Sequence, residues 1–329
     1  MEKKKSLFHP IPEALIRAVE ESSCIAIISH VNPDGDAIFS SLALSCILGK
    51  LGKEVHLFND GPFSRKEIMG YAHLFSSSVN EEVKEKHPLV VILDCSTEDR
   101  PGMVYQELKG GKTIVIDHHA SGRAFYDEEL SYIVPLSPST TLLVDELRIA
   151  LGVELEKEFA EYLLLGFLTD TGFFHFISDI QAPDSFKKVS SFISTGLNPY
   201  ELYDRMHDGR KLDDVKLVAR ILEECEPALG GKVIIAYEKK DSSSSERPGD
   251  SVYPALLECE GVKVVVLIKE KENGIEFGFR AKRNANVDVG ALASSLSGGG
   301  HVLAAGATVE NLKSEDAKSF ILEKLRPLV

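Results

Sequence analysis

Four clusters of histidine and aspartate each follow an apolar run of the chain, at the point where that run ends. Side chains of these types bind metals, and the mixture of imidazole and carboxylate suits Mn²⁺, Fe²⁺, Co²⁺ or Zn²⁺ better than Ca²⁺. Several aspartates held close together would also repel one another unless cations lay between them. The candidate ligands are His30, Asp34 and Asp36, then Asp94, then the triplet Asp117-His118-His119, and finally Asp170.

These ligands are too many for one ion. The simplest interpretation is a site for two ions that share a bridging aspartate. Such a pair, about 3.5–4 Å apart, activates a water molecule and clamps a phosphoryl group during in-line displacement. A single aspartate at a strand end is more often a helix cap or a turn residue. Because all four clusters stand at the ends of strands or helices, the pattern favours one common site over four coincidences.

The elements that must position these residues alternate along the first part of the chain. Short runs rich in valine and isoleucine predict strands at 25–29, 54–58, 89–93 and 112–116. Helical spacing predicts helices at 12–21 and 37–51 and further helices across 139–174. This alternation is typical of an α/β fold with a doubly wound, mostly parallel sheet. The carboxyl ends of its strands meet in one crevice, so the first three clusters should converge there, with Asp170 supplied by a helix.

Near residues 195–215 glycine, asparagine, proline and many charged residues replace the longer apolar runs, and we place a domain connection there. We expect a first domain over residues 1–195, a linker and connecting helix over 196–225, and a smaller α+β domain over 226–329. Within the last domain we expect strands at 232–237, 262–268 and 275–280, and helices at 289–296 and 314–325. Residues 239–250, which include four consecutive serines, are predicted to form an exposed loop.

The composition excludes some classes of protein. The 329 residues carry 51 acids against 37 bases, a net charge of −14, which excludes a protein that holds long nucleic acid by neutralising its phosphates. Residues 261–329, with 10 Lys and Arg against 8 Asp and Glu, form the one basic part. No apolar run reaches the ~18 residues of a membrane span. Five scattered cysteines are typical of buried thiols in a reducing compartment, so we expect a cytoplasmic protein without a membrane partner.

The order and spacing of the motifs resemble the DHH phosphoesterase family, which is named for the triplet at 117–119. The clusters at 30–36, 94 and 170 match its first, second and fourth motifs, and residues 298–301 and 304–306 match the glycine-rich motif of its DHH-associated domain. The resemblance covers essentially the whole chain. It is strongest to the short NrnA-like enzymes, which degrade very short oligonucleotides and dephosphorylate 3′-phosphoadenosine 5′-phosphate (pAp).

This resemblance implies two divalent ions, with Mn²⁺ favoured, and an active site in the cleft between a catalytic and a substrate-binding domain. Asp94 would bridge the ions and act with His119, which would contact the scissile phosphate. Asp117 would orient the neighbouring histidines from behind the ligands. The implied ligand sets are His30, Asp34 and Asp94 for one ion, and Asp36, Asp94, His118 and Asp170 for the other.

The C-terminal glycine motif is implied to hold the far end of the substrate. Consecutive glycines let the backbone approach a phosphate and offer several N–H donors. Arg280 matches the family arginine that grips a terminal phosphate or base, whereas Lys282 and Arg283 fit substrate contact and solvated strand ends equally well. The implied substrate-binding residues are His119, Arg280, Gly298, Gly299, Gly300 and His301.

Two positions depart from the family pattern. Phe39 stands where a glycine is usual, and its ring could crowd the helix packing beneath the metals or narrow the pocket. Ser297 stands where a fourth glycine is common. Both departures bear on substrate preference more than on metal binding.

The function implied is a Mn²⁺-dependent phosphodiesterase of the 3′–5′ exoribonuclease or oligoribonuclease type, which releases nucleoside 5′-monophosphates and also dephosphorylates pAp. Hydrolysis of cyclic di-AMP or of its linear product pApA is the alternative. A catalytically silent nucleotide sensor would be expected to have lost a metal ligand, and none of the six is missing. The expected partner is a short oligonucleotide or an adenine nucleotide. The resemblance also implies that the protein could form a homodimer.

Overall fold

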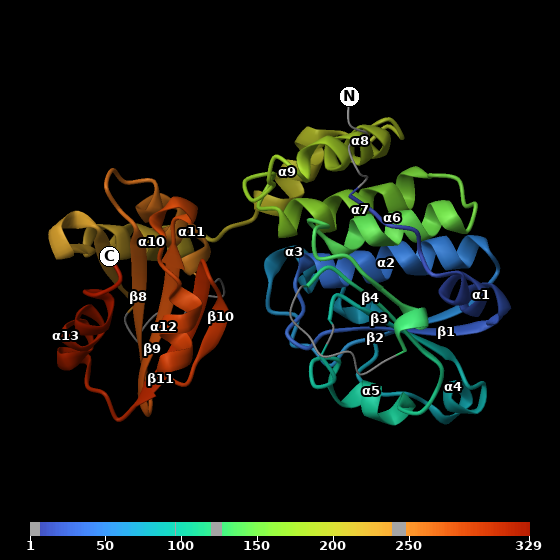
Figure 1. The fold of residues 1–329 in the computed structure, drawn as a ribbon, viewed down its shortest axis with the longest axis horizontal. Coiled ribbons are helices and arrows are strands. Elements are labelled where there is room, and N and C mark those ends of the chain that lie inside the picture. Colours follow the sequence, from blue (N-terminus) through green and yellow to red (C-terminus); the bar gives the residue numbers. More distant parts are fainter. Residues whose placement is uncertain (1–6, 96, 120–126, 239–247) are drawn as a thin grey trace. The chain divides into compact units, whose positions relative to one another are not determined.

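The computed structural model describes residues 7–95, 97–119, 127–238 and 248–329, and the chain forms two compact units, residues 1–208 and 209–329 (Figure 1). The observed division lies inside the segment 196–225 that the sequence marks as the connection. Helix α9 (Pro199–His207) ends the first unit, and α10 (Leu212–Glu223) begins the second.

The first unit is built on a five-stranded sheet whose strands are all parallel, in the order β2-β1-β3-β4-β5. The four predicted strands are present, and β5 is an additional strand of three residues. The strands are β1 (Cys24–Ser29), β2 (Glu54–Phe58), β3 (Leu89–Leu93), β4 (Thr113–Asp117) and β5 (Ser131–Ile133).

Helices cover both faces of this sheet, as a doubly wound fold requires (Figure 1). Alternate residues of β1 show the division, because Ile25 and Ile27 belong to the core under one set of helices and Ala26 and Ile28 to the core under the other. The first face carries α2 (Gly35–Lys50), α6 (Thr140–Ala150) and α7 (Lys157–Asp170), and the second carries α4 (Glu81–Glu85) and α5 (Gly102–Leu108). The remaining helices of this unit are α1 (Glu13–Glu21), the short α3 (Lys66–Met69) and α8 (Ala182–Ile193).

Helix α2 is apolar on every side because it lies between the sheet and α7. Its first turns are almost entirely buried, including Asp36 and Phe39. The helix begins at Gly35, two residues before the predicted start, because Asp34 caps it by accepting a hydrogen bond from the Ala37 amide at 3.1 Å. The start of α2 therefore places Asp34 and Asp36 at the carboxyl edge of the sheet.

The second unit is a six-stranded mixed sheet in the order β10-β11-β9-β8-β7-β6, in which β7 and β8 are the parallel pair. Its two faces bury separate cores, one under α12 and α13 and the other under α10 and α11. The elements not yet given are β6 (Glu226–Ala228), β7 (Val233–Glu238), α11 (Gly249–Leu257), β8 (Val264–Lys271), β9 (Gly274–Ala281), α12 (Val289–Ser295), β10 (Gly299–His301), β11 (Ala304–Glu310) and α13 (Ser314–Leu325).

The predicted loop over residues 239–250 needs correction at its end, since α11 already begins at Gly249. Residues 239–247 lie outside the described part of the chain. Strands β10 and β11 are rich in glycine and alanine, which explains why no strand was predicted there. Among the described residues, no helix combines the length and apolarity needed to cross a membrane.

Candidate metal centre

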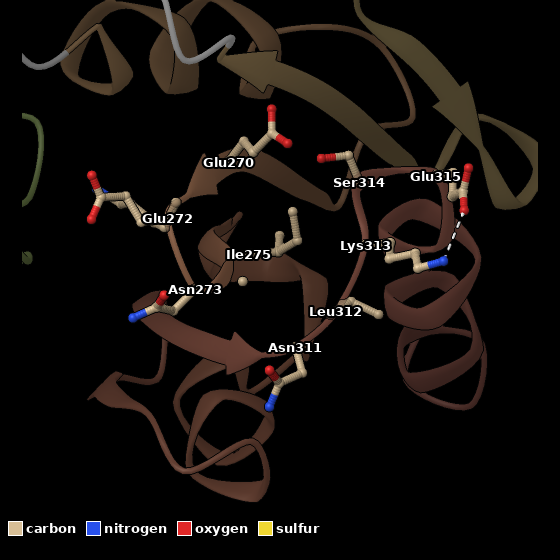
Figure 2. Close-up of a pocket in the computed structure, with 11 residues that line it drawn as sticks. Glu270, Glu272, Asn273, Ile275, Asn311, Leu312, Lys313, Ser314 and Glu315 are labelled. Atoms are coloured by element: carbon tan, nitrogen blue, oxygen red, sulfur yellow. Dashed lines mark ion pairs between the residues drawn. The ribbon is translucent and has the colours of Figure 1, made fainter.

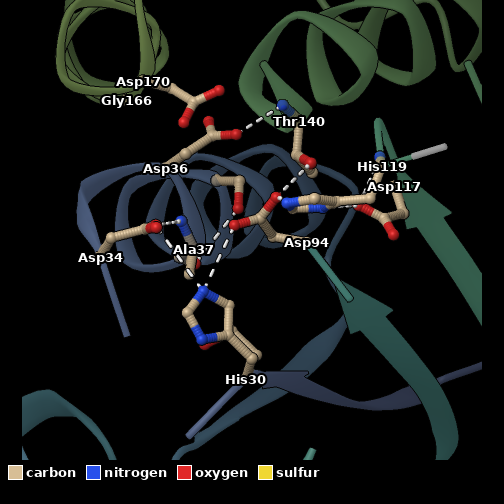
Figure 3. A network of polar contacts seen from close by, with 12 residues as sticks. His30, Asp34, Asp36, Ala37, Asp94, Asp117, His119, Thr140, Gly166 and Asp170 are labelled. Carbon is tan, nitrogen blue, oxygen red and sulfur yellow. Dashed lines mark hydrogen bonds and ion pairs between the residues drawn. The ribbon is translucent and has the colours of Figure 1, made fainter. Parts of the chain in front are cut away.

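Three neighbouring strands deliver the candidate ligands to one edge of the first sheet (Figure 3). His30 follows β1, Asp94 follows β3, and β4 ends at Asp117, directly before His118 and His119. Since β1, β3 and β4 are adjacent and parallel, their carboxyl ends lie together. The beginning of α2 and the end of α7 add the remaining acids, Asp34, Asp36 and Asp170, from above this edge.

The first group of ligands is His30, Asp34 and Asp94, whose ligand atoms all lie within 4.8 Å of one another. The His30 Nε2 atom is 3.7 Å from Asp34 Oδ1 and 3.5 Å from Asp94 Oδ2. Asp94 and His30 are almost fully buried, whereas 27% of the Asp34 side chain is exposed. Asp34 therefore marks the side from which solvent reaches this group.

The second group is Asp36, His118 and Asp170, again with all ligand atoms within 4.8 Å. The His118 Nε2 atom lies 3.4 Å from Asp170 Oδ2 and 3.9 Å from Asp36 Oδ2. It also lies 3.5 Å from Asp94 Oδ1. Asp94 thus turns one oxygen toward His30 of the first group and its other oxygen toward His118 of the second.

Backbone carbonyls fix the orientation of both histidines. The Nδ1 atom of His30 lies 2.9 Å from the Val31 carbonyl oxygen, and that of His118 lies 3.1 Å from the Ser137 carbonyl oxygen. A carbonyl oxygen can only accept, so Nδ1 carries a proton in each ring and Nε2 faces the carboxylates. A hydrogen bond behind the ring of this kind is the usual arrangement of histidines that bind metal through Nε2.

Threonines at the start of α6 hold the acids of the cluster, and the sequence did not single them out. The Thr140 hydroxyl donates to Asp94 Oδ1 at 2.9 Å, and the Thr140 and Thr141 amides donate to Asp36 at 2.6 and 3.0 Å. The amino end of a helix favours negative charge, so α6 supports the Asp36 carboxylate. Ser139 caps this helix, and the run Ser139-Thr140-Thr141 at its start was the one available signal.

Asp94 occupies a left-handed backbone conformation, with φ at 59°. For a residue with a Cβ atom this conformation costs of order 1–3 kcal/mol and persists where surrounding contacts enforce it. Its amide donates to the Ile116 carbonyl at 3.1 Å and its side chain accepts from Thr140. These contacts keep the carboxylate between the two groups of ligands.

Asp117 lies behind the histidine pair and is fully buried. Its Oδ1 atom accepts hydrogen bonds from the His118 and His119 amides at 2.8 and 3.2 Å. The same oxygen lies 2.8 Å from His119 Nδ1, which is 3.7 Å from Asp94 Oδ1. Asp117 therefore fixes the ring of His119 at the edge of the cluster.

The pKa values show how charge accumulates in the site without cations. Burial lowers the pKa of His30 and of His118, but the carboxylates that face them outweigh burial and raise these pKa values to about 10 and about 9. Burial, together with neighbouring acids, raises the pKa of Asp170 to about 7 and that of Asp36 well above its ordinary value. In the metal-free site, bound protons therefore neutralise acids that divalent ions would otherwise neutralise. The set of donor atoms fits two such ions.

The close packing of α2 against α7 requires glycine at two positions. A Cβ atom at Gly35 would lie 2.4 Å from Thr169 Oγ1. A Cβ atom at Gly166 would lie 2.4 Å from Thr141 Cγ2 and 3.1 Å from Asp36 Oδ1. These contacts bring the end of α7, and with it Asp170, onto the cluster.

Phe39 lies in this helix interface rather than in an open pocket. It is 1% exposed, and its ring centroid is 5.5 Å from that of Tyr71 and 6.3 Å from that of Tyr162. Its Cβ atom is 3.3 Å from the position of a Cβ atom at Gly166. The sequence left two effects open for this bulky residue, crowding of the helix packing beneath the metals or narrowing of the pocket. The ring lies in the helix packing, in keeping with the first of these.

Of the predicted substrate-binding residues of the second unit, Arg280 lies on β9 and Gly299, Gly300 and His301 lie on β10, while Gly298 directly precedes β10; β11 lies between the two strands. His301 of β10 pairs with Ala304 of β11, which pairs with Arg280 of β9. The Arg280 guanidinium carbon lies 4.7 Å from the ring centroid of Tyr253 on α11, within cation–π range. The structure therefore brings together Arg280 and the glycine motif, which are distant in sequence.

Two of the three glycines have a structural reason of their own. A Cβ atom at Gly298 would lie 2.2 Å from the Gly306 carbonyl oxygen, and one at Gly300 would lie 2.5 Å from the Ala304 carbonyl oxygen. A Cβ atom at Gly299 would meet nothing within 4 Å. Ser297 has a φ of 62°, the left-handed region that favours glycine, so the usual glycine fits this backbone better.

The two basic residues beyond Arg280 differ in their surroundings. The Lys282 ammonium donates to the Cys259 carbonyl oxygen at 3.0 Å, in an exposed position. Arg283 lies in the short 3₁₀ turn Arg283–Ala285 that follows β9. The contact of Lys282 with backbone is that of a strand-end charge.

A separate hollow of about 480 Å³ lies at the hairpin between β8 and β9 (Figure 2). Its charged lining residues are Glu270, Lys271, Glu272, Lys313 and Glu315, and the Lys313 ammonium is 3.7 Å from Glu315. Arg280 stands at the other end of β9, six residues or about 20 Å along the strand. This hollow is therefore distinct from the strands that carry the glycine motif.

The fold and the cluster together define a class: a parallel sheet with histidines and aspartates at its carboxyl edge, followed by a mixed-sheet domain, is the architecture of the DHH phosphoesterases. The chain belongs to this family, since the DHH family N-terminal domain matches residues 24–167 and the DHHA1 domain matches residues 216–328. The family and the fold expected from the sequence are thus confirmed.

Among characterised relatives, the chain is 33% identical to a bifunctional oligoribonuclease and PAP phosphatase NrnA of Thermus thermophilus, over 95% of this chain and 91% of that protein. It is 25% identical to the NrnA of Bacillus subtilis, over 94% and 97% of the two chains. It is also 25% identical to a cyclic-di-AMP phosphodiesterase GdpP of Geobacillus thermodenitrificans, over 96% of this chain but 49% of that protein.

Solved structures resemble the fold along nearly the whole chain. An exopolyphosphatase-related protein from Bacteroides fragilis superposes with a TM-score of 0.82 at 24% identity and covers 95% of each chain. RecJ from Thermus thermophilus, solved in complex with Mn²⁺, gives a TM-score of 0.57 at 15% identity and is covered over 57% of its length. At these identities the likeness establishes the fold.

Proposed function

We propose that this protein is a two-metal phosphodiesterase that hydrolyses very short oligonucleotides to nucleoside 5′-monophosphates and also removes the 3′-phosphate of pAp. The observation that carries the proposal is the placement of Asp94, whose two carboxylate oxygens face different histidines, His30 at 3.5 Å and His118 at 3.5 Å. A carboxylate so placed can serve two ions at once, and a pair of ions is suited to in-line displacement at phosphorus.

We assign the donor atoms to two sets, as the family resemblance implies, and Mn²⁺ fits a mixture of imidazole and carboxylate. When bound, the pair of ions would polarise the phosphoryl oxygens and lower the pKa of a water molecule. The residues that would hold the ions are His30, Asp34 and Asp94 for one, and Asp36, Asp94, His118 and Asp170 for the other.

His119 is the residue proposed to contact the scissile phosphate. Burial lowers its pKa, but the hydrogen bond of Nδ1 to Asp117 and the nearby Asp94 carboxylate outweigh burial and raise it. A protonated imidazole donates to phosphate oxygens and offsets negative charge that develops on them. Asp117 acts through His119 by fixing its ring and its charge.

The substrate is proposed to be short because the similar NrnA proteins are oligoribonucleases. By the family resemblance, Arg280, Gly299 and His301 of the second unit would bind a phosphate or base of that substrate. Residues 261–329 are the basic part of an acidic chain, in keeping with a single anionic group bound there. The net charge of −14 is at odds with a long nucleic acid laid across the protein.

The similarity to NrnA enzymes over nearly the full length of both chains supports oligonucleotides and pAp as substrates. The similarity to the cyclic-di-AMP phosphodiesterase GdpP, which also extends along nearly the whole of this chain, supports a second candidate, cyclic di-AMP or its linear product pApA.

A substrate panel with added Mn²⁺ tests the proposal: RNA of two to five nucleotides, pAp, pApA and cyclic di-AMP. We expect the highest kcat/KM on the RNA dinucleotide and measurable release of phosphate from pAp. A clear preference for cyclic di-AMP would favour the second candidate. Absence of turnover on all four compounds would refute a phosphodiesterase of this kind.

A further inference from the structure

Another group of metal-type side chains lies at the opposite end of the first sheet from the metal centre. Cys24 is the first residue of β1, and Glu54 and His56 lie on β2, the edge strand. The Cys24 Sγ atom, a Glu54 carboxylate oxygen and a His56 ring nitrogen all lie within 4.8 Å of one another. Six residues, about 20 Å of extended strand, separate Cys24 from His30, so this group is independent of the first.

The sheet itself brings the three side chains together. Cys24 and Glu54 are register partners on the hydrogen-bonded strands β1 and β2. Glu54 and His56 are two residues apart on one strand, so their side chains project from the same face. The His56 ring stacks on the ring of Phe58, with centroids 6.3 Å apart and planes at 25°, which limits its rotation. The arrangement is therefore built into the strand register.

We propose that Cys24, Glu54 and His56 form a second cation site, for an ion of the Zn²⁺ class. Thiolate, imidazole and carboxylate are the three ligand types that Zn²⁺ accepts, and three protein ligands leave one position for water. The soft thiolate distinguishes this site from the cluster of nitrogen and oxygen ligands at the carboxyl edge, and it disfavours Mn²⁺.

A lysine occupies part of this site in the structure. The Lys86 ammonium lies 2.8 and 3.1 Å from the two Glu54 oxygens and 3.1 Å from Glu82 Oε1. A divalent ion would displace Lys86 from Glu54, and Glu82 remains as its partner. The Lys86 ammonium therefore competes with a divalent ion for Glu54. If the three side chains bind an ion, removal of this ammonium should tighten the binding.

Binding would also displace a proton from the thiol. Burial, followed by the neighbouring Glu54 carboxylate, raises the pKa of Cys24, so the thiol is protonated in the absence of metal. Metal affinity should therefore increase with pH. Because β2 is the edge strand of the sheet and pairs with β1, an ion held by residues from both strands would tie the edge strand to the sheet.

Co²⁺ alone is the probe for the test, because a cobalt–thiolate bond gives a charge-transfer band in the near ultraviolet that nitrogen and oxygen ligands do not. The full-length protein would carry Cys225→Ser and Cys259→Ser, since Cys259 is the exposed thiol. We expect the band to appear on titration, to be lost in Cys24→Ser, and to persist in the matched control Cys46→Ser.

Two further variants keep the test decisive even if Cys24→Ser folds poorly. We expect His56→Ala to weaken Co²⁺ binding at this site at least about tenfold. We expect Lys86→Met to strengthen it by up to about fivefold, since the competing ammonium is gone. Asp94→Asn should retain the band. Absence of a thiolate band at saturating Co²⁺, its persistence in Cys24→Ser, or no tightening in Lys86→Met would overturn the proposal.

Discussion

Metal binding at the cluster should release protons, because the raised pKa values of several ligands keep them protonated in the metal-free protein. The pKa values of His30 and His118 are about 10 and about 9 in the metal-free protein, so both rings are protonated at pH 7–8. Each ring must lose its Nε2 proton to become a ligand. Loading both ions should therefore release at least two protons, because the Asp36 and Asp170 carboxyls, whose pKa values are also raised, must be ionised as well. The overall affinity for Mn²⁺ should rise about tenfold per proton, or at least about 100-fold from pH 7 to pH 8.

Isothermal titration of Mn²⁺ in two buffers with different ionisation enthalpies measures this proton release. The exposed His73, whose Nδ1 contacts the Gly70 carbonyl at 2.9 Å, provides the control variant His73→Gln, which should release the same number of protons. Release of less than one proton, or an affinity that is unchanged between pH 7 and pH 8, would refute the charge state derived from the geometry.

The same pKa values set the direction of stability with pH. The pKa values of both histidines are raised from an ordinary value of 6.5. Their contribution to the free energy of unfolding of the metal-free protein is therefore fully present below about pH 6.5. That contribution is lost as the pH rises through about 9 and 10. Saturating Mn²⁺ should therefore raise Tm more at pH 9 than at pH 6.5, and the reverse order would contradict this linkage.

Three substitutions test other parts of the account. Asp117→Asn should lower kcat about 10–100-fold with Mn²⁺ stoichiometry unchanged, because it weakens the hydrogen bond that orients His119; an equal loss of bound metal would show a ligand role instead. Phe39→Ala should lower the free energy of unfolding by about 3–5 kcal/mol in chemical denaturation, since it empties a buried space between α2 and α7. Ser297→Gly should raise the free energy of unfolding by about 1 kcal/mol by relieving the left-handed backbone, and no gain would argue against strain there.

The elements that carry the ligands could be predicted because their sequence is locally unambiguous. The run Leu89-Val90-Val91-Ile92-Leu93 is buried on both faces and coincides with β3. Similar runs define β1 and β4, and the shared direction of the strands follows from the helices between them. The convergence of His30, Asp94 and Asp117 was therefore predictable from strand order alone.

What the sequence could not provide depends on contacts between distant segments. The Thr140 and Thr141 amides reach Asp36 across 104 and 105 positions, and no local pattern announces such a pairing. Strands β10 and β11 lack β-branched runs and form through hairpin pairing onto β9. The pairing of Gly166 with Phe39 likewise appears only once α2 and α7 have packed.

The central claim is that Asp94 bridges two ions that are required for hydrolysis. Bound Mn²⁺ and the rate of cleavage of a 5′-phosphorylated RNA dinucleotide should be measured on the same samples of wild type and Asp94→Asn. We expect two ions per chain in the wild type, turnover that requires both, and a kcat at least about 100-fold lower in the variant. Wild-type turnover in Asp94→Asn, or full activity with one ion per chain, would contradict the claim.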